Sequence, residues 1–380
     1  NSSHNYGNAL MRLFSFLLVC FTVAIQTGQS QEIVRIGLLD FSQAEILKIR
    51  SVSGGYHWLN ATGQVLDTLT ESAQISIQDK QWKGNNLPLE NHLILQPIVP
   101  GSVLSIQSVH TGYRQVKGVL HLFAESDVRC ILETPLEAYL PGVLAAEAGK
   151  GHFPDFYEAQ AIVSRTYTVQ SMGRHRLEGF DLCNSVHCQV FQGISTVNDT
   201  ILSAVMSTRD LILIDEYNRP ITAAFPSNCG GHTQGSEAVW QHALPYLKGV
   251  PDPFCLTYPH SHWEQLIDAI AWRDWLQSKS GDTIPPIQWL HTKRESFLMN
   301  REDAIRTSQA RKAFGFRSGF FITLNEGDSI RVIGRGFGHG VGMCQEGAMG
   351  RAKAKHDAWD ILSHYYHKVS LTQWQNAQLE

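Results

Sequence analysis

The chain has 380 residues, of which 43% are hydrophobic and 17% are charged, and its formal net charge is −4. This length suits one large domain or two modest ones, and the composition excludes both a largely disordered chain and a membrane protein. The small negative charge, without a stripe of lysine and arginine, argues against a nucleic-acid partner, because phosphate binding requires clustered cations. We therefore expect a globular protein with a substantial hydrophobic core.

The first 30 residues predict an upstream extension followed by a secretory signal peptide. Residues 1–10 precede Met11, which is the expected natural start. The apolar run over 13–25 is too short to cross a bilayer as a helix, and Gly28 and Ser30 are the small residues that precede a cleavage site. A buried N-terminal strand is the alternative. We predict Sec-dependent export to the periplasm, the cell wall or the extracellular space, without a transmembrane anchor.

Residues 31–117 predict a small β-rich accessory region. Apolar and polar residues alternate over 34–38, 55–59 and 73–77, and Gly, Asn and Asp separate these runs. Alternation with a period of two is typical of half-buried strands bounded by turns. No catalytic cluster is found in this region.

The pattern changes near residue 118, where helices begin to alternate with strands. Pro135 suits the first turn of a helix. Apolar residues then recur at helical spacing, with Asp155 available as N-cap and Gly173 as a stop. The elements expected here are strands over 119–123 and 128–132, a helix from Pro135 and a longer helix over 156–167.

The rest of the chain predicts further helices and one hairpin. A turn sequence over 215–220 lies between apolar runs at 211–214 and 221–225, which favours a hairpin. Helices are expected over 199–206, after Cys344 and over 357–367. The predicted fold class is α+β, with a single catalytic domain over 118–375 that follows the β-rich region.

Three blocks of sequence, in this order, resemble a known family. They are Glu137–Glu147 with Glu158–Tyr167, Cys188–Gly193 with Ser227–Thr233, and Gly334–Ala348 with Ile361–Tyr366. Together they resemble the SpoIID/LytB family over residues 118–372. The resemblance implies a lytic transglycosylase that cleaves peptidoglycan glycan strands stripped of their stem peptides. The alternative is a non-catalytic, glycan-binding enhancer of a cell-wall amidase.

Glu147 falls at the catalytic glutamate of that family. Hydrolytic glycosidases generally need two carboxylates, whereas a lytic transglycosylase can use one, because the C6 hydroxyl of the substrate attacks the anomeric carbon. The glutamate must first be protonated, and its apolar neighbours over 143–146 predict a pKa raised by desolvation. The alternative is an ordinary surface glutamate at a helix end.

A compact group of metal-ligand residues follows the long predicted helix. His175, Cys183, His187 and Cys188 could close a tetrahedral zinc site, and the resemblance supports zinc here. A closed set of four ligands makes the metal structural, whereas three ligands and a water would indicate a zinc amidase. The alternative is a Cys183–Cys188 disulfide, which an oxidising compartment favours.

Three residues within the blocks are candidates for substrate binding. Arg165 and Gln189 could contact sugar hydroxyls, and His339 lies in a glycine-rich stretch that would allow close approach of a bulky ligand. The structural alternatives are a scaffold salt bridge for Arg165, a backbone cap for Gln189, and a histidine that fixes its own loop for His339.

The remaining cysteines predict a bridge and a helix cap. Cys229 and Cys255 are expected to form a disulfide, because neither belongs to a recurring ligand pattern. The alternative is two free thiols. Cys344 precedes a predicted helix, a position that favours its thiolate. The family that the chain resembles often has a serine there, which implies a helix cap rather than a nucleophile.

Overall fold

The computed structural model describes residues 32–84, 87–124, 128–240, 242–280, 298 and 305–379. The chain divides after Gln31 into two units, and everything below concerns the second, Glu32–Glu380. The predicted upstream extension and signal peptide lie outside the described residues. In the described part of the chain, no helix combines the length and the hydrophobicity needed to span a membrane. The α+β class and the β-rich N-terminal region are confirmed.

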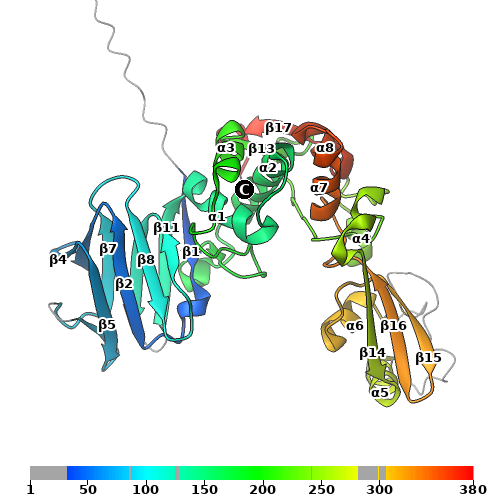
Figure 1. Cartoon of the computed structure of the whole chain (residues 1–380), viewed down its shortest axis with the longest axis horizontal. Helices are drawn as coiled ribbons and strands as arrows, with labels where there is room; N and C mark the ends of the chain where they lie inside the picture. The colour runs from blue at the N-terminus through cyan, green and yellow to red at the C-terminus, as the bar shows by residue number, and fades with distance from the viewer. Residues whose placement is uncertain are drawn as a thin grey trace, which may run out of the picture. The chain divides into compact units, whose positions relative to one another are not determined.

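Two sheets form most of the described part before residue 136 (Figure 1). One has the order β12 (Leu182–Cys183), β1 (Ile33–Gly37), β11 (Val128–Pro135), β10 (Val119–Ala124), β7 (His92–Pro97), β3 (Tyr56–Asn60) and β4 (Val65–Leu69). The other has the order β6 (Gln81–Gly84), β5 (Ser72–Gln78), β2 (Ile46–Ser53), β8 (Val103–Ser108) and β9 (Arg114–Val116). In β2, Leu47 and Ile49 are buried while their neighbours are exposed, so alternation turns one face towards the core.

The first sheet crosses the boundary expected at residues 117 and 118. Strand β1 pairs antiparallel with β11 and parallel with β12, and β10 pairs with β7. Backbone hydrogen bonds therefore join the predicted accessory region to the predicted catalytic domain. The N-terminal strands also support β12, which carries Cys183.

Helices follow β11 and pack against one another. They are α1 (Leu136–Ala148), α2 (Pro154–Ser171), α3 (Asp199–Ser207), α7 (Gln345–Lys353) and α8 (Ala358–Tyr365). Helix α2 is buried over much of its length and contacts α1, α3, α7 and α8. Its N-cap is Phe153 with Pro154 in the first turn, so the expected cap at Asp155 is wrong; Asp155 instead lies in the first turn, where a negative charge is favourable.

The predicted hairpin after residue 210 has only one of its strands. Strand β13 (Leu211–Ile214) and the turn are present, but the return arm contributes one bridge, Ile214 to Pro220. The Ile221 N–H also donates to the Leu213 carbonyl, and β13 pairs in addition with β17 (Ser370–Gln373). Pro220 has no N–H to donate to a ladder, and the Ala224 carbonyl accepts hydrogen bonds from Met343 N–H and the Tyr366 hydroxyl.

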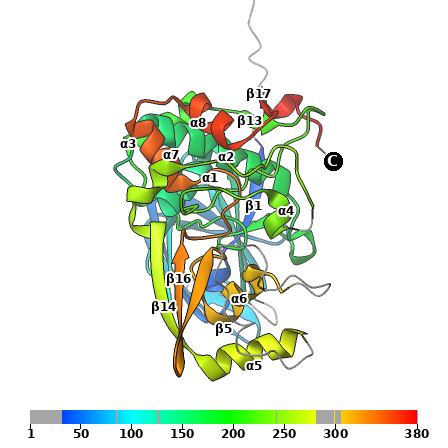
Figure 2. The same ribbon diagram turned by 90° about the vertical axis from the view of Figure 1, so that its right-hand side faces the viewer.

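A second hydrophobic core lies between residues 263 and 332. Strands β14 (His262–Asp268), β16 (Ser329–Arg335) and β15 (Phe321–Glu326) form a sheet in that order. Figure 2 shows β14 and β16 side by side, with α5 (Ala269–Ser280) near their end. Trp263, Trp272 and Phe321 pack in this core together with residues of α6 (Thr307–Phe314). The sequence pattern did not separate this part from the rest.

Candidate active site and metal centre

Glu147 lies in the last turn of α1, half-buried behind a run of buried apolar residues. The Val190 N–H donates a hydrogen bond of 2.6 Å to Glu147 Oε1. Burial raises the pKa of Glu147, and the hydrogen bond from Val190 opposes that rise. The C-terminal end of a helix also disfavours a negative charge. The predicted desolvation of this carboxyl group is therefore confirmed.

Two segments from distant parts of the sequence contact Glu147. One carries Val190, which binds the side chain. The other carries Gln345, the first residue of α7, whose amide Nε2 lies 3.5 Å from the Glu147 carbonyl oxygen and 3.4 Å from Gln160 Oε1. The carboxyl group is thus held by the 188–191 segment, while the helix end beneath it is held by the start of α7.

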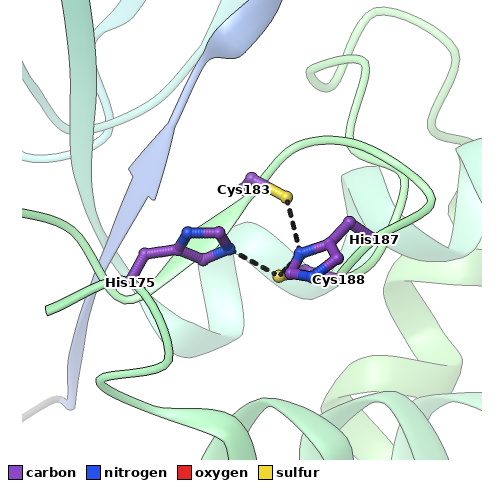
Figure 3. Close-up of side chains that lie close together, drawn as sticks. All are labelled: His175, Cys183, His187 and Cys188. Atoms are coloured by element: carbon purple, nitrogen blue, oxygen red, sulfur yellow. Dashed lines mark hydrogen bonds between the residues drawn. The ribbon is translucent and has the colours of Figure 1, made fainter. Parts of the chain in front are cut away.

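The four predicted metal ligands come together near β12. Figure 3 shows His175, Cys183, His187 and Cys188 facing one another. Cys188 Sγ lies 3.4 Å from His175 Nε2 and 3.6 Å from His187 Nδ1, and Cys183 Sγ lies 3.8 Å from His187 Nδ1. We call these four residues the Cys/His cluster.

These distances fit a single tetrahedral ion. Zinc bonds of about 2.3 Å to sulfur and about 2.0 Å to nitrogen place neighbouring ligand atoms about 3.5 Å apart. His175 Nδ1 lies 2.6 Å from Glu178 Oε1. That contact fixes the Nδ1–H tautomer and leaves Nε2 free to bind metal, as carboxylate partners of zinc-binding histidines do. The donor set and its surroundings therefore suit zinc.

Hydrogen bonding also prepares one sulfur for metal binding. Burial would raise the pKa of Cys183, but hydrogen bonds from Ser185 and His187 outweigh it and lower that pKa to about 6. A thiolate rather than a thiol is the form that binds metal. Both Cys183 and Cys188 are free thiols in the structure.

Arg165 and Gln189 have no exposed surface, with 0% of either residue accessible to solvent. The Arg165 guanidinium donates two hydrogen bonds to Glu137, of 2.7 and 2.8 Å, and another to the Leu211 carbonyl. Gln189 Nε2 donates to Thr168 Oγ1 at 2.8 Å. The predicted sugar contacts are therefore wrong for both side chains, because their donors are used inside the scaffold.

His339 is half-buried and holds its own loop. Val341 N–H donates to His339 Nδ1 at 3.1 Å, and the ring centroid lies 5.9 Å from that of Trp240. Burial lowers the pKa of His339 to about 4, and the positive charge of Arg311 adds to this. The ring is therefore neutral near pH 7, with its proton on Nε2. A sugar contact through Nε2 stays a prediction.

The two cysteines expected to be bridged are free thiols in the structure. Cys229 Sγ and Cys255 Sγ lie 3.6 Å apart, so the predicted disulfide is not formed there. Two further groups share their site: Cys344 and Asp252. The Cys344 sulfur accepts a hydrogen bond from Gly347 N–H as N-cap of α7, which confirms the predicted cap.

Three contributors to the site were not assigned a role from sequence. Val190 acts through its backbone, for which a side-chain pattern gives no signal. Gln345 lies within the third sequence block, but only its packing against α1 reveals its contacts. Glu178 could have been found, because an acid three residues after a candidate ligand histidine is a suitable carboxylate partner.

Comparison with known proteins gives a consistent result. The SpoIID family, described as "Stage II sporulation protein", matches residues 124–214. Stage II sporulation protein D of Bacillus subtilis is 30% identical over 264 residues, covering 63% of this chain and 75% of that protein. The protein of the same name from Bacillus amyloliquefaciens is 29% identical over 297 residues, covering 70% of this chain and 85% of that protein.

A third relative carries a different name. The "Amidase enhancer" of Bacillus subtilis is 25% identical over 293 residues. The match covers 62% of this chain but only 40% of that protein. The segment matched by the family description contains Glu147 and the whole Cys/His cluster.

Proposed function

The chain belongs to the stage II sporulation protein D family, and from that premise we propose that it is an exported lytic transglycosylase. Its substrate is peptidoglycan glycan strands stripped of stem peptides, and Glu147 is the single general acid and base. The observation that carries this proposal is the setting of Glu147: a half-buried carboxyl group whose pKa is raised by burial.

A raised pKa supports the acid role because the group must deliver a proton before it can accept one. Burial is the first cause of the rise, and among the described residues no acidic side chain contributes to it. The site is therefore unlike a carboxylate dyad, in which two acids share one proton. One carboxyl group is sufficient where the nucleophile belongs to the substrate.

The reaction then needs no water. Protonated Glu147 donates its proton to the glycosidic oxygen, and the bond from that oxygen to the anomeric carbon breaks. The C6 hydroxyl of the same muramic acid attacks the anomeric carbon, and the Glu147 carboxylate takes the proton of that hydroxyl. The acid is regenerated, and the product ends in a 1,6-anhydro ring. The Val190 N–H holds the carboxyl group throughout.

We assign a structural zinc ion to the Cys/His cluster. His175, Cys183, His187 and Cys188 would hold it, and the ion would supply cross-linking of the loop rather than chemistry. Val190 follows Cys188 by two residues, so an ion there would fix the segment that binds Glu147. Four protein ligands leave no open position for a water, which argues against a zinc amidase.

A second candidate function is a glycan-binding enhancer of a cell-wall amidase. The similarity to the "Amidase enhancer" of Bacillus subtilis favours it. In that case Glu147 contacts the glycan without catalysis, and the partner is a separate amidase. Both functions require export to the cell wall, which is part of the proposal.

Product analysis separates the two functions. Purified protein is incubated with glycan strands freed of stem peptides, and the products are analysed by mass spectrometry. A transglycosylase gives anhydro ends, which are one water lighter than hydrolysed reducing ends. An enhancer leaves the strands intact and accelerates an added amidase. Hydrolysed ends would contradict the single-carboxylate reaction, because an activated water needs a second base.

A further inference from the structure

A second group of ligand-type side chains lies outside the site described above. Cys229, Asp252, Cys255 and Cys344 bring their ligand atoms within 4.8 Å of one another. Each of these four residues is at most 1% exposed. They come from three separate segments: a glycine-containing loop, the 3-10 helix η3 (Pro253–Thr257) with the residue before it, and the N-cap of α7. We call these residues the Cys/Asp cluster.

We propose that the Cys/Asp cluster binds a second structural zinc ion through three thiolates and one carboxylate. This inference is independent of the proposed catalytic activity and of the metal assigned to the Cys/His cluster.

The spacing is that of a ligand shell around one ion. Cys229 Sγ lies 3.6 Å from Cys255 Sγ and 3.4 Å from Asp252 Oδ2. Zinc bonds of about 2.3 Å to sulfur and about 2.1 Å to oxygen give tetrahedral edges of about 3.8 and 3.6 Å. Bonded sulfurs would lie about 2.0 Å apart. Atoms this close leave room for one ion and not for an iron–sulfur cluster, and a sulfur-rich tetrahedron favours zinc.

Backbone donors point at the sulfurs. Cys344 Sγ accepts hydrogen bonds from Cys229 N–H at 3.2 Å and from Gly347 N–H at 3.3 Å, and Cys255 Sγ accepts one from Gly231 N–H at 3.2 Å. Such donors favour the thiolate, which is the metal-binding form. Gly230 and Gly231 have φ values of 74° and 101°, conformations that favour glycine, so this turn of the loop depends on both.

The Asp252 carboxylate accepts a hydrogen bond at one oxygen, but its other oxygen has no hydrogen-bond partner in the described part of the chain. The Tyr365 hydroxyl donates to Asp252 Oδ2 at 2.9 Å. Within the described residues, Asp252 Oδ1 has no hydrogen-bond partner, and Arg351 Nε lies 3.9 Å from it. A fully buried carboxylate among sulfurs is costly unless a cation compensates it. A divalent ion and the Arg351 guanidinium together offset three of the four negative charges of the liganded site.

The ion would fasten the segment that reaches Glu147. Cys344 is followed directly by Gln345, which contacts the Glu147 carbonyl. The loop at Cys229 in turn exchanges backbone hydrogen bonds between Asn228 and Phe337 in the glycine-rich stretch. A bound ion would therefore hold the loop, η3 and the start of α7 together next to the candidate active site.

Metal analysis of the purified full chain tests the inference. We expect two zinc ions per chain, falling to one in Cys344→Ser. Cys183→Ser should also retain one, because it disrupts only the Cys/His cluster. Cys130→Ser is the matched control: Cys130 is also buried but belongs to neither cluster, so this variant should retain two.

Thiol mapping keeps the test decisive if a variant does not fold. The wild-type chain is denatured with a chelator, without reductant, and alkylated. We expect labelling at Cys229, Cys255 and Cys344. A Cys229–Cys255 disulfide, or a single zinc that persists in Cys344→Ser and is lost in Cys183→Ser, would overturn the inference while leaving the proposed function intact. A single zinc that persists in Cys183→Ser and is lost in Cys344→Ser would support zinc binding by the Cys/Asp cluster and contradict zinc binding by the Cys/His cluster.

Discussion

The Cys/His cluster and the Cys/Asp cluster have parallel positions beside Glu147. Cys188 of the first lies two residues before Val190, which binds the carboxyl group, and Cys344 of the second lies one residue before Gln345, which binds the helix end. The first cluster is assembled from one short stretch of chain, and the second from three distant segments. The comparison shows that two segments contact the candidate catalytic residue, and that each contact lies within two residues of a cluster that could hold a metal.

The clusters differ in their access to solvent. His187 is exposed and His175 is half-buried, whereas all four residues of the Cys/Asp cluster are buried. In the Cys/His cluster, His175 contacts the carboxylate of Glu178, which lies at the surface. The second is enclosed by backbone donors and by Tyr365. If both bind zinc, local unfolding of a few residues should be enough to release the ion from the Cys/His cluster. Release from the Cys/Asp cluster should require unfolding of a larger part of the chain.

We expect the largest effect, a loss of activity, from substitution of Glu147, which both segments contact. Glu147→Gln keeps the shape and the hydrogen bond from Val190 but cannot transfer a proton. Activity on stripped glycan strands should fall by about 10²-fold or more while glycan binding is retained. Glu158→Gln is the matched control, because Glu158 lies on α2 and accepts a hydrogen bond from Ser207. Full activity of Glu147→Gln would refute the catalytic assignment and favour the amidase enhancer.

Removal of the ligand Cys183 tests whether the Cys/His cluster stabilises its loop by binding a metal. Cys183→Ser should abolish zinc binding at the Cys/His cluster and lower the free energy of unfolding by roughly 3 kcal/mol or more, because a structural ion contributes to folding. Metal analysis and thermal unfolding measure the two effects. Ser185→Ala removes the hydroxyl contacts to Cys183 Sγ and to the His187 N–H but no metal ligand, so it should keep the ion. A Cys183–Cys188 bridge in a disulfide map would show that the loop is closed covalently instead.

A chelator distinguishes the two clusters by their burial. With an excess of a strong chelator and a zinc-sensitive dye, release should occur in two phases. The phase lost in Cys183→Ser should be the faster, by about tenfold or more, because the exposed His187 allows local access. The reverse order, in which the buried cluster releases first, would contradict the comparison.

The smallest effect concerns stability and pH. The folded-state pKa of Glu147 is raised above its ordinary value of 4.5. The folded chain therefore binds this proton more tightly than the unfolded chain, and stability falls as pH rises from the ordinary pKa through the raised one. Glutamine does not ionise, so Glu147→Gln should unfold at a higher temperature than the wild type near pH 7. The difference should disappear below about pH 4, where both states of the wild type are protonated. An equal difference at all pH values would show that packing, not ionisation, causes it.

The sequence by itself determined the features that depend on neighbours along the chain. Alternation and helical spacing identified five strands and three helices before residue 210, since each pattern reflects which side chains one element buries. These elements are β1, β3, β5, β10, β11, α1, α2 and α3; the strands β2, β7 and β8 were not identified. The run of apolar residues before Glu147 predicted its raised pKa. The Cys/His cluster was predictable because its ligands lie in one loop between residues 175 and 188, where a short chain alone brings them close.

Tertiary structure decided the features that depend on which surfaces meet. Arg165 and Gln189 have the chemistry of sugar contacts, and only the packing of α2 placed them inside the scaffold. Strand β13 pairs with β17, which lies about 160 residues further along the chain, and no local pattern indicated that partner. The Cys/Asp cluster joins Cys229, Asp252 and Cys344 across long stretches of chain. A local pattern reports which apolar side chains are buried, but not which polar side chains are buried with them or what they pack against, and for these residues the packing partner decides the chemistry.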